Sequence, residues 1–395
     1  MLYLQDCEWI RSAVICNFYF QHVCCSSNHA MVSLLKCCGV FITVIAIFVG
    51  LLISGVLRQA GLFKLINPSL PDMLTGMVPA LMDGIEWSYT FDDVAKADLT
   101  GQIALVTGAN AGIGRSLSAH LAKQGATVYM ACRNDAKCAR ASAAIVGNTK
   151  TLTLDTSSLA SVRACAAEFK SKAGEDAALD MMFQNAGTAN GKANDDGSLK
   201  QTEDGIENVF QTNHVGHHLL FKLLRSHIEA APTARIVLTS SASHYDSYAY
   251  GVATTLEQLN GAKASDGVMM PYGQSKLVQV LWAAELTQQL GADSSIFVNS
   301  FHPGAVATEI WGKNEVIPSG VRSVIENYKN GMMWSCDEGA LTGLFLGIHV
   351  GVVDRSIRGK YYHPQSQEVT PSEQARDAKL QKAAWKFVDG LVLEK

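Results

Sequence analysis

Short apolar segments alternate along most of the chain with longer segments in which apolar residues recur every three or four positions. Residues 102–108, QIALVTG, form a β-branched apolar run that ends in glycine, as a buried parallel strand does. Residues 114–125 have apolar positions at helical spacing and end at a glycine, which predicts a helix. Further strands are predicted over 126–132, 151–155, 179–187, 234–241 and 295–304, and further helices over 136–147, 158–172, 203–228 and around 272–276.

Strands that alternate with helices of this length specify a parallel sheet with helices on both faces. The expected fold class is therefore α/β, with one doubly wound, parallel-sheet Rossmann domain over residues 101–395. In such a sheet, ligands bind beyond the carboxyl ends of the strands. The sequence contains no repeat and no sign of a second folded domain.

An uncharged apolar stretch precedes this domain. Residues 37–57 lie between Lys36 and Arg58 and carry no charge. As a helix they would reach about 31 Å, close to the thickness of the hydrocarbon core of a bilayer. We expect a single transmembrane anchor, with a buried core helix or a cleaved signal peptide as the alternatives. Residues 1–36 are expected to be a poorly ordered extension and residues 58–100 a linker.

The composition of the chain limits the classes of partner that it is expected to bind. The net charge is −4 and no run of Lys and Arg resembles a nucleic-acid-binding surface, so we expect no nucleic-acid partner. Of ten cysteines, six lie before or at the apolar stretch. The others, Cys132, Cys138, Cys165 and Cys336, show no metal-ligand spacing. Cys132 and Cys138 are interpreted as small apolar residues on or near a buried element, and nothing demands an oxidising compartment.

Three glycines follow the first predicted strand and open the first predicted helix. Gly108 permits a tight turn, Gly112 lets the backbone approach a pyrophosphate, and Gly114 lets the helix pack close to the strand. Free N–H groups at the start of the helix favour phosphate charge. The strand–turn–helix context therefore predicts a dinucleotide site, which also includes Asn110 and Ile113.

The second strand indicates which dinucleotide binds. An NAD site usually ends this strand with an acid that accepts from the ribose 2′-hydroxyl. Here the strand ends at Cys132, and Arg133 follows. Arg133, helped by Arg115, suits the 2′-phosphate of NADP(H). The alternative is that Arg133 is a solvated charge and that Asp135 contacts the ribose.

A tyrosine and a lysine stand four residues apart in YGQSK, residues 272–276, and would share one face of a helix. A nearby ammonium favours the ionised form of a phenol, so Tyr272 is a candidate proton donor and acceptor. Tyrosine and lysine are common on helix surfaces, and the pair alone does not establish chemistry.

Several motifs in one order carry a family resemblance. They are T-G-x-x-x-G-I-G at 107–114, N-A-G at 185–187, a serine that closes the fifth strand, and Y-x-x-x-K at 272–276. Together they resemble the short-chain dehydrogenase/reductase family, from about residue 100 to about residue 390. Segments 204–224, 272–281, 300–310 and 370–392 look most like the branch that contains the retinol dehydrogenases and the WW-domain oxidoreductases.

The resemblance implies a role for each matching residue. Tyr272 would be the general acid/base that gives a proton to a carbonyl oxygen, and Lys276 would lower the pKa of Tyr272 and bind the nicotinamide ribose. Ser241 would hydrogen-bond the substrate oxygen, with its neighbour Ser240 as the alternative. Asn213 would hold the water that links Lys276 to solvent. The resemblance places further cofactor contacts at Asp155, Asn185, Ala186, Gly187, Pro303, Gly304 and Thr308.

Two other features of the sequence bear on the site. The insert 243–270 makes the spacing between Ser241 and Tyr272 longer than in many members of the family. It is expected either to border the substrate or to be a surface excursion. His214, His217 and His218 lack acids or cysteines at ligand spacing, and we expect no metal.

The sequence thus predicts a membrane-anchored, NADP-dependent oxidoreductase that interconverts an alcohol and a ketone or aldehyde. The expected substrate is small and apolar, such as a retinoid, a steroid or another isoprenoid. Residues 37–57 would hold the chain in the endoplasmic reticulum or another endomembrane, and a homo-oligomer is compatible with the sequence. The alternatives are a double-bond reductase similar to the protochlorophyllide reductases and a non-catalytic nucleotide-binding protein.

Overall fold

The structure is a computed structural model that describes residues 88–189, 193–267, 269–308 and 333–393. The chain divides into units 1–65 and 66–395, and every described residue belongs to the second unit. The predicted extension, the anchor at 37–57 and most of the predicted linker lie outside the described residues. Within the described ranges, no helix combines the length and the apolar character that a bilayer crossing requires.

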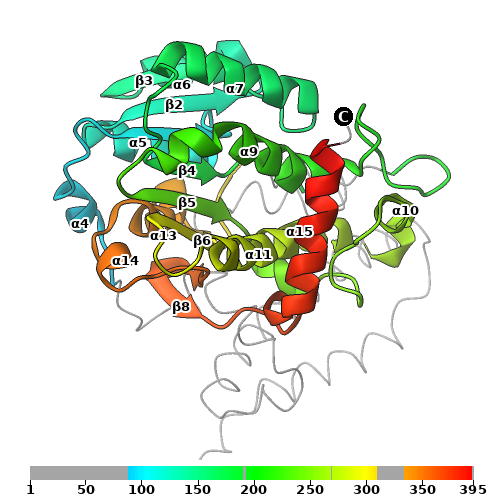
Figure 1. Ribbon diagram of the computed structural model, residues 1–395. Helices are drawn as coiled ribbons and strands as arrows, with labels where there is room; N and C mark the ends of the chain where they lie inside the picture. Colours follow the sequence, from blue (N-terminus) through cyan, green and yellow to red (C-terminus); the bar gives the residue numbers. More distant parts are fainter. Residues whose placement is uncertain (1–87, 190–192, 268, 309–332, 394–395) are drawn as a thin grey trace, which may run out of the picture. The chain divides into compact units, whose positions relative to one another are not determined.

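One eight-stranded sheet forms the centre of the described domain (Figure 1). Its strand order is β3-β2-β1-β4-β5-β6-β7-β8, in which β8 is antiparallel to β7 and every other neighbouring pair is parallel. The predicted doubly wound parallel sheet is therefore confirmed. The strands are β1 Ile103–Thr107, β2 Thr127–Cys132, β3 Asn148–Thr153, β4 Met181–Gln184, β5 Ala234–Thr239, β6 Ile296–Phe301, β7 Tyr361–His363 and β8 Gln367–Val369.

Helices cover both faces of the sheet and connect the strands (Figure 1). They are α4 Phe91–Ala95, α5 Gly112–Lys123, α6 Asp135–Ala143, α7 Leu159–Ala173, α8 Asn208–Phe210, α9 Gly216–Glu229, α10 Leu256–Gly261, α11 Met270–Leu290, α13 Cys336–Ile348, α14 Gly351–Asp354 and α15 Ala378–Leu393.

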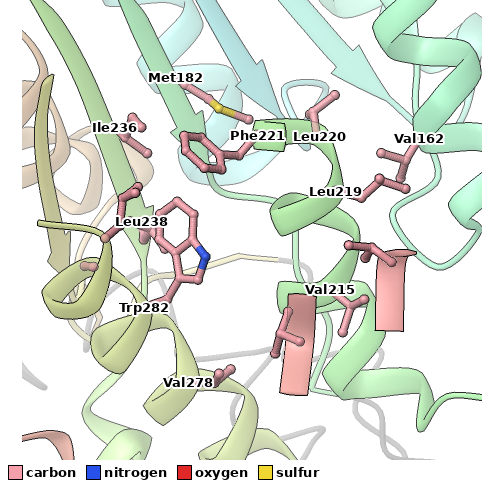
Figure 2. Close-up of a cluster of buried hydrophobic side chains, with 14 of the residues drawn as sticks. Val162, Met182, Val215, Leu219, Leu220, Phe221, Ile236, Leu238, Val278 and Trp282 are labelled. Carbon is pink, nitrogen blue, oxygen red and sulfur yellow. The ribbon is translucent and has the colours of Figure 1, made fainter. Parts of the chain in front are cut away.

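Alternate residues of the strands point to opposite faces of the sheet and supply two hydrophobic cores. Leu105 of β1 belongs to the core that α7, α9, α11 and α15 cover, whereas Val106 belongs to the core that α5, α6 and α13 cover. Figure 2 shows Met182, Phe221 and Trp282 among the side chains gathered in the first core. Burial on both faces explains why the strands have near-continuous apolar sequences.

The long helix predicted over 203–228 is interrupted. Glu207 accepts hydrogen bonds from the backbone N–H groups of Val209 and Phe210, so helical structure begins only after it. A π-helical turn, Gln211–Val215, then separates α8 from α9. Such turns insert one residue into a helix and are frequent at functional sites, and this one contains Asn213.

Two strands are absent from the sequence-based prediction. β7 and β8 have three residues each and are joined by a turn through Pro364–Ser366. Such short segments show neither an alternating nor a continuous apolar pattern. They form because β6 offers an unpaired edge, to which Tyr361 and Tyr362 of β7 add in parallel register.

The interpretation of Cys132 and Cys138 as small apolar residues at a buried element is confirmed for their burial, but it did not include a bond between them. Both side chains are buried, as expected, but a disulfide joins them. Cys132 ends β2 and Cys138 lies in the second turn of α6, six positions later. A spacing of six residues suggests no pairing by itself, because only the strand-to-helix turn brings the two sulfur atoms together.

The last helix, α15, packs against α11 and α9 through rings and through a partly exposed carboxylate that pairs with Lys222. Trp385 stacks on Trp282 of α11, with 5.5 Å between the ring centroids. The indole N–H of Trp282 donates to Nδ1 of His218, so Nε2 carries the hydrogen that is donated to Asp389 of α15. Lys222 also donates to Asp389. These bonds hold α15 over the two helices that flank the functional site.

We expect Asp389→Ala to lower the free energy of unfolding by about 1–3 kcal/mol, because the buried His218 N–H loses its acceptor. Asp389→Asn retains an amide oxygen and should lose less. The hydrogen bond from His218 lowers the pKa of Asp389 to about 2. The stabilisation should therefore be complete above roughly pH 4 and lost as the pH falls through 2. Urea unfolding across this pH range measures both effects, and equal stability of wild type and Asp389→Ala would contradict them.

Candidate functional site

A cavity of about 1180 Å³ lies at the carboxyl ends of the parallel strands. This is the edge at which the sequence analysis expects ligands to bind. The predicted site residues that line it are Gly108, Asn110, Gly112, Ile113, Arg115, Arg133, Asp155, Asn185, Ala186, Gly187, Ser241, Tyr272, Lys276, Pro303, Gly304 and Thr308. Gly114 and Asn213 do not line the cavity, and both lie directly behind residues that do.

The glycine loop forms one end of this cavity. Gly108 and Gly112 have φ values of +66° and +56°, in the left-handed region that favours glycine. At Gly114, an added Cβ would lie 2.5 Å from Nδ2 of Asn185 and closer still to the carbonyl oxygen of Gly108. Position 114 therefore requires glycine because there is no space for a Cβ, and not because of the backbone φ angle. The loop leaves a concave backbone surface at the start of α5, which fits a pyrophosphate.

A threonine at the end of β1 holds the next part of the cavity wall. The hydroxyl oxygen of Thr107 accepts from the backbone N–H groups of Asn185 and Ala186, both at 2.9 Å. Asn185 also donates its side-chain amide to the carbonyl oxygen of Thr107 at 3.0 Å. The N-A-G segment is thereby fixed beside the glycine loop.

His217 connects this wall to α9. Its Nδ1 lies 2.9 Å from the carbonyl oxygen of Asn213, which only accepts, so Nδ1 carries the hydrogen. Nε2 therefore accepts from the hydroxyl of Thr107, 2.8 Å away. Burial lowers the pKa of His217 to about 4, so the imidazole is neutral at pH 7. His217 serves as a buried structural residue here rather than as a charged group.

The two serines at the end of β5 have different partners. Ser240 donates its hydroxyl to the carbonyl oxygen of Lys276 at 2.9 Å, and its side chain is thus committed to α11. The hydroxyl oxygen of Ser241 accepts from the backbone N–H of Ser243 at 3.1 Å and hydrogen-bonds Tyr272. Of the two serines, Ser241 has the geometry for contact with a substrate.

Tyr272 and Lys276 lie in the first turns of α11, on the face that the spacing predicts. Lys276 donates to the carbonyl oxygen of Thr239 at 2.7 Å. Burial of this ammonium lowers the pKa of Lys276 to about 7. Nζ of Lys276 lies over the ring of Tyr272, 5.5 Å from its centroid, rather than against the phenol oxygen.

The expected lowering of the Tyr272 pKa is wrong for this geometry. Burial raises the pKa of Tyr272 to about 12, although the hydrogen bond with Ser241 acts in the opposite direction. Lys276 is itself buried and directs its ammonium at the Thr239 carbonyl, and desolvation is the larger influence on Tyr272. Tyr272 is consequently a protonated phenol at neutral pH.

Asn213 supports the wall of the site. Its side chain accepts from the backbone N–H of Thr188 at 2.7 Å and donates to Ser275 at 2.8 Å. Its carbonyl oxygen accepts from His217 and Gln279. The role in holding a water molecule stays a prediction. The π-helical turn places these groups between β4 and α11, so Asn213 joins the N-A-G segment to the helix that carries Tyr272.

The remaining predicted residues complete the cavity. Asp155 follows β3, and its carboxylate accepts from the backbone N–H and the hydroxyl of Ser157. Thr308 lies across the loop from Gly112, where an added Cβ would be 3.2 Å from the Thr308 methyl group. Arg115 and Arg133 are exposed at the cavity wall.

The chain is similar to several known proteins. A model of the family described as short chain dehydrogenase matches residues 102–253. Human retinol dehydrogenase 13 is 31% identical over 300 residues, which cover 74% of this chain and 84% of that protein. The WW domain-containing oxidoreductase of Gallus gallus is 29% identical over 304 residues, covering 75% and 69%. The crystal structure of an uncharacterised protein from Mycobacterium paratuberculosis has a TM-score of 0.58 at 26% identity and covers 76% and 97%.

A doubly wound sheet with a glycine-lined cavity and a Ser–Tyr–Lys set in the cavity wall defines a dinucleotide-dependent oxidoreductase. More specifically, the chain belongs to the short-chain dehydrogenase/reductase family, in a branch similar to the retinol dehydrogenases. It is an enzyme that uses NAD(H) or NADP(H) to interconvert CH–OH and C=O groups. The family resemblance stated from the motifs is confirmed.

Sequence reasoning missed several residues that build the site. Thr107 fixes the N-A-G segment, His217 joins β1 to α9, and Ser243 contacts Ser241. The only signal for Thr107 was its place in the glycine motif. His217 and Ser243 gave no signal, because their partners are distant in sequence or are backbone groups.

We expect Gly114→Ala to weaken binding of the dinucleotide by at least about tenfold and to lower stability, because the methyl group would meet the Gly108 carbonyl and Asn185. Gly390→Ala in α15 is the matched control, since an added Cβ there meets no atom within 4 Å. Cofactor fluorescence titration and thermal unfolding measure the two effects. Unchanged affinity in a folded Gly114→Ala protein would show that the loop does not hold the cofactor.

Proposed function

We propose that the enzyme is an NADP(H)-dependent oxidoreductase that interconverts an alcohol and a ketone or aldehyde on an apolar substrate. The preference for NADP(H) over NAD(H) is inferred from the positively charged side chains at the end of β2. Arg133, Lys137 and Arg140 line the cavity, whereas Asp135 does not. The carboxylate of Asp135 instead accepts from the hydroxyl of Thr153 at 2.7 Å. This arrangement favours a 2′-phosphate over a ribose 2′-hydroxyl.

When bound, the cofactor supplies the hydride, and the protein binds, orients and moves a proton. In reduction, Ser241 would donate a hydrogen bond to the carbonyl oxygen, and Tyr272 would transfer its phenolic proton to the same oxygen. The raised pKa of Tyr272 keeps that proton available at neutral pH. Lys276 would hold the nicotinamide ribose and return a proton to Tyr272 after each turnover.

The part of the cavity near Tyr272 supports an apolar substrate. Ala242, Met269 and Val306 line it and belong to the same segments as Ser241, Tyr272 and Pro303. Met269 comes from the insert 243–270, which supports the expectation that the insert borders the substrate rather than forming a surface excursion. Relatives of this chain are named retinol dehydrogenases, and retinol is an apolar alcohol of the expected kind.

Membrane attachment belongs to the same proposal. By its sequence, the segment 37–57 is long and apolar enough to span a bilayer. An apolar substrate would dissolve in the same bilayer. We place the enzyme at the endoplasmic reticulum or another endomembrane, held by this one segment. Release of a truncated chain lacking residues 1–57 from the membrane fraction would support the anchor.

The pH dependence of the two reaction directions should differ. Above roughly pH 8, Lys276, with a pKa of about 7, has already lost its proton, whereas Tyr272, with a pKa of about 12, has not. Alcohol oxidation needs the phenolate, so its kcat/KM should rise about tenfold per pH unit between roughly pH 8 and pH 10. The kcat/KM of carbonyl reduction uses the phenol already present in the free enzyme and should stay level over the same range. A plateau in the oxidation profile above pH 8 would contradict a raised Tyr272 pKa.

The main test is turnover by detergent-solubilised full chain with retinal, steroid ketones and short aldehydes, each with NADPH or NADH. We expect NADPH-preferring reduction of at least one apolar carbonyl. Tyr272→Phe should lower kcat by about 100-fold or more while cofactor binding is retained. Arg133→Gln should raise KM for NADPH and leave KM for NADH unchanged.

Each contrary result points to a different alternative. Preference for NADH would contradict the role of Arg133, and turnover confined to small polar carbonyls would contradict the substrate class. A product with a saturated ring in place of an alcohol would favour the double-bond reductase. NADPH binding without turnover of any substrate would favour a non-catalytic nucleotide-binding protein.

A further inference from the structure

The disulfide between Cys132 and Cys138 lies directly beneath the cations at the end of β2. Cys132 is the last residue of β2, and Cys138 faces the core from α6. The five residues between them form the strand-to-helix connection and the first turn of α6, which carry Arg133 and Lys137. The disulfide thus closes a small ring around the part of the chain that would meet the 2′-phosphate.

Apart from the disulfide, few contacts fasten the start of α6 to the domain, whereas Ser142 near its end hydrogen-bonds Thr149 of β3 at 2.7 Å. Of its nine residues only Cys138 and Ala141 are buried, so the disulfide includes one of the two core contacts of this helix. The other bonds of the turn lie at the surface. Asn134 caps the helix by accepting from the backbone N–H of Lys137, and Asp135 accepts from Thr153. Exposed bonds of this kind compete with water and contribute little to holding the turn.

Among the residues that the structure describes, the cations of this turn and of α6 have no side-chain partner. Arg133, Lys137 and Arg140 are exposed and line the cavity, and no ion pair or side-chain hydrogen bond within the described ranges engages them. Their positions therefore depend on the backbone that carries them. A covalent tie from β2 to α6 restricts that backbone before any ligand binds.

We propose that the Cys132–Cys138 disulfide is a specificity-determining element of the cofactor site, which positions Arg133 and Lys137 for the 2′-phosphate of NADP(H). The inference rests on the proposed preference for NADP(H). The two cysteines are positioning residues, since they act through the cations and touch no ligand. NADH has no 2′-phosphate, so its binding should depend little on the disulfide.

Loss of the disulfide is expected to weaken the binding of NADPH much more than the binding of NADH. Loss of the disulfide should raise the Kd of NADPH about tenfold, the size expected when a residue or two must be ordered on binding. The Kd of NADH should change by less than about twofold, because the glycine loop and the nicotinamide end are untouched. A purely structural role for the disulfide would instead weaken both cofactors equally.

The experiment measures the Kd of NADPH and of NADH by fluorescence for the full chain in detergent, before and after treatment with a water-soluble phosphine. The phosphine takes oxygen from water and becomes a phosphine oxide as the disulfide becomes two thiols. Peptide mass spectrometry without other reductants verifies the linkage before treatment and the two thiols after it. Reduction of the wild type needs no substitution, so misfolding of a variant does not obscure the result.

Two variants complete the design. Cys138→Ala should show the raised NADPH Kd with and without the phosphine, which separates this disulfide from the other cysteines of the chain. Cys165→Ala, which removes another buried cysteine that forms no disulfide, should respond to the phosphine as the wild type does.

Three results would overturn the inference. They are an unchanged NADPH Kd after verified reduction, an equal loss of affinity for NADPH and NADH, and free thiols at Cys132 and Cys138 in the untreated protein. These failures are distinct from failure of the proposed function. An oxidised wild type that binds NADH as tightly as NADPH contradicts the cofactor proposal itself. A protein that prefers NADPH equally in both redox states contradicts the role of the disulfide alone.

Discussion

At Gly114 the first turn of α5 lies against the carbonyl oxygen of Gly108 and the side chain of Asn185, with no room for a methyl group between them. This contact sets the distance between α5 and β1. It also brings the N-A-G segment that follows β4 against the glycine loop, so that Gly108, Ala186 and Gly187 share one wall of the cavity. The rest of the site is arranged around this close approach.

A buried chain of polar groups extends the constraint across the domain. Thr107 at the end of β1 donates to His217, His217 donates to the carbonyl of Asn213, and Gln279 of α11 donates to the same carbonyl. Because buried polar groups are costly when unpaired, each member fixes the next. The helix that carries Tyr272 and Lys276 is thereby held in register with the strand that carries the glycine loop.

Much of the fold and of the candidate site could be predicted from local sequence. The strand-and-helix alternation and the contiguous motifs around Gly112, Asn185 and Tyr272 each lie within a few residues, where spacing determines geometry. What could not be predicted depends on distant partners. The disulfide of Cys132 forms only when α6 folds back onto β2, and the pKa of Tyr272 is raised only by burial among its neighbours in the folded domain. Strand β7 forms only because β6 offers it a free edge.

The reversal of the last strand has a consequence for self-association. A sheet edge offers unpaired backbone groups to other chains, and a long, flat, apolar edge strand invites aggregation. Here the sheet ends on β8, which is only three residues long and carries Glu368 in an ion pair with Lys360. The opposite edge of the sheet is β3 (Figure 1). Its Asn148 and Lys150 side chains are exposed. Short and charged edges oppose sheet-to-sheet pairing, so contact between copies of this domain would favour its helical and loop surfaces.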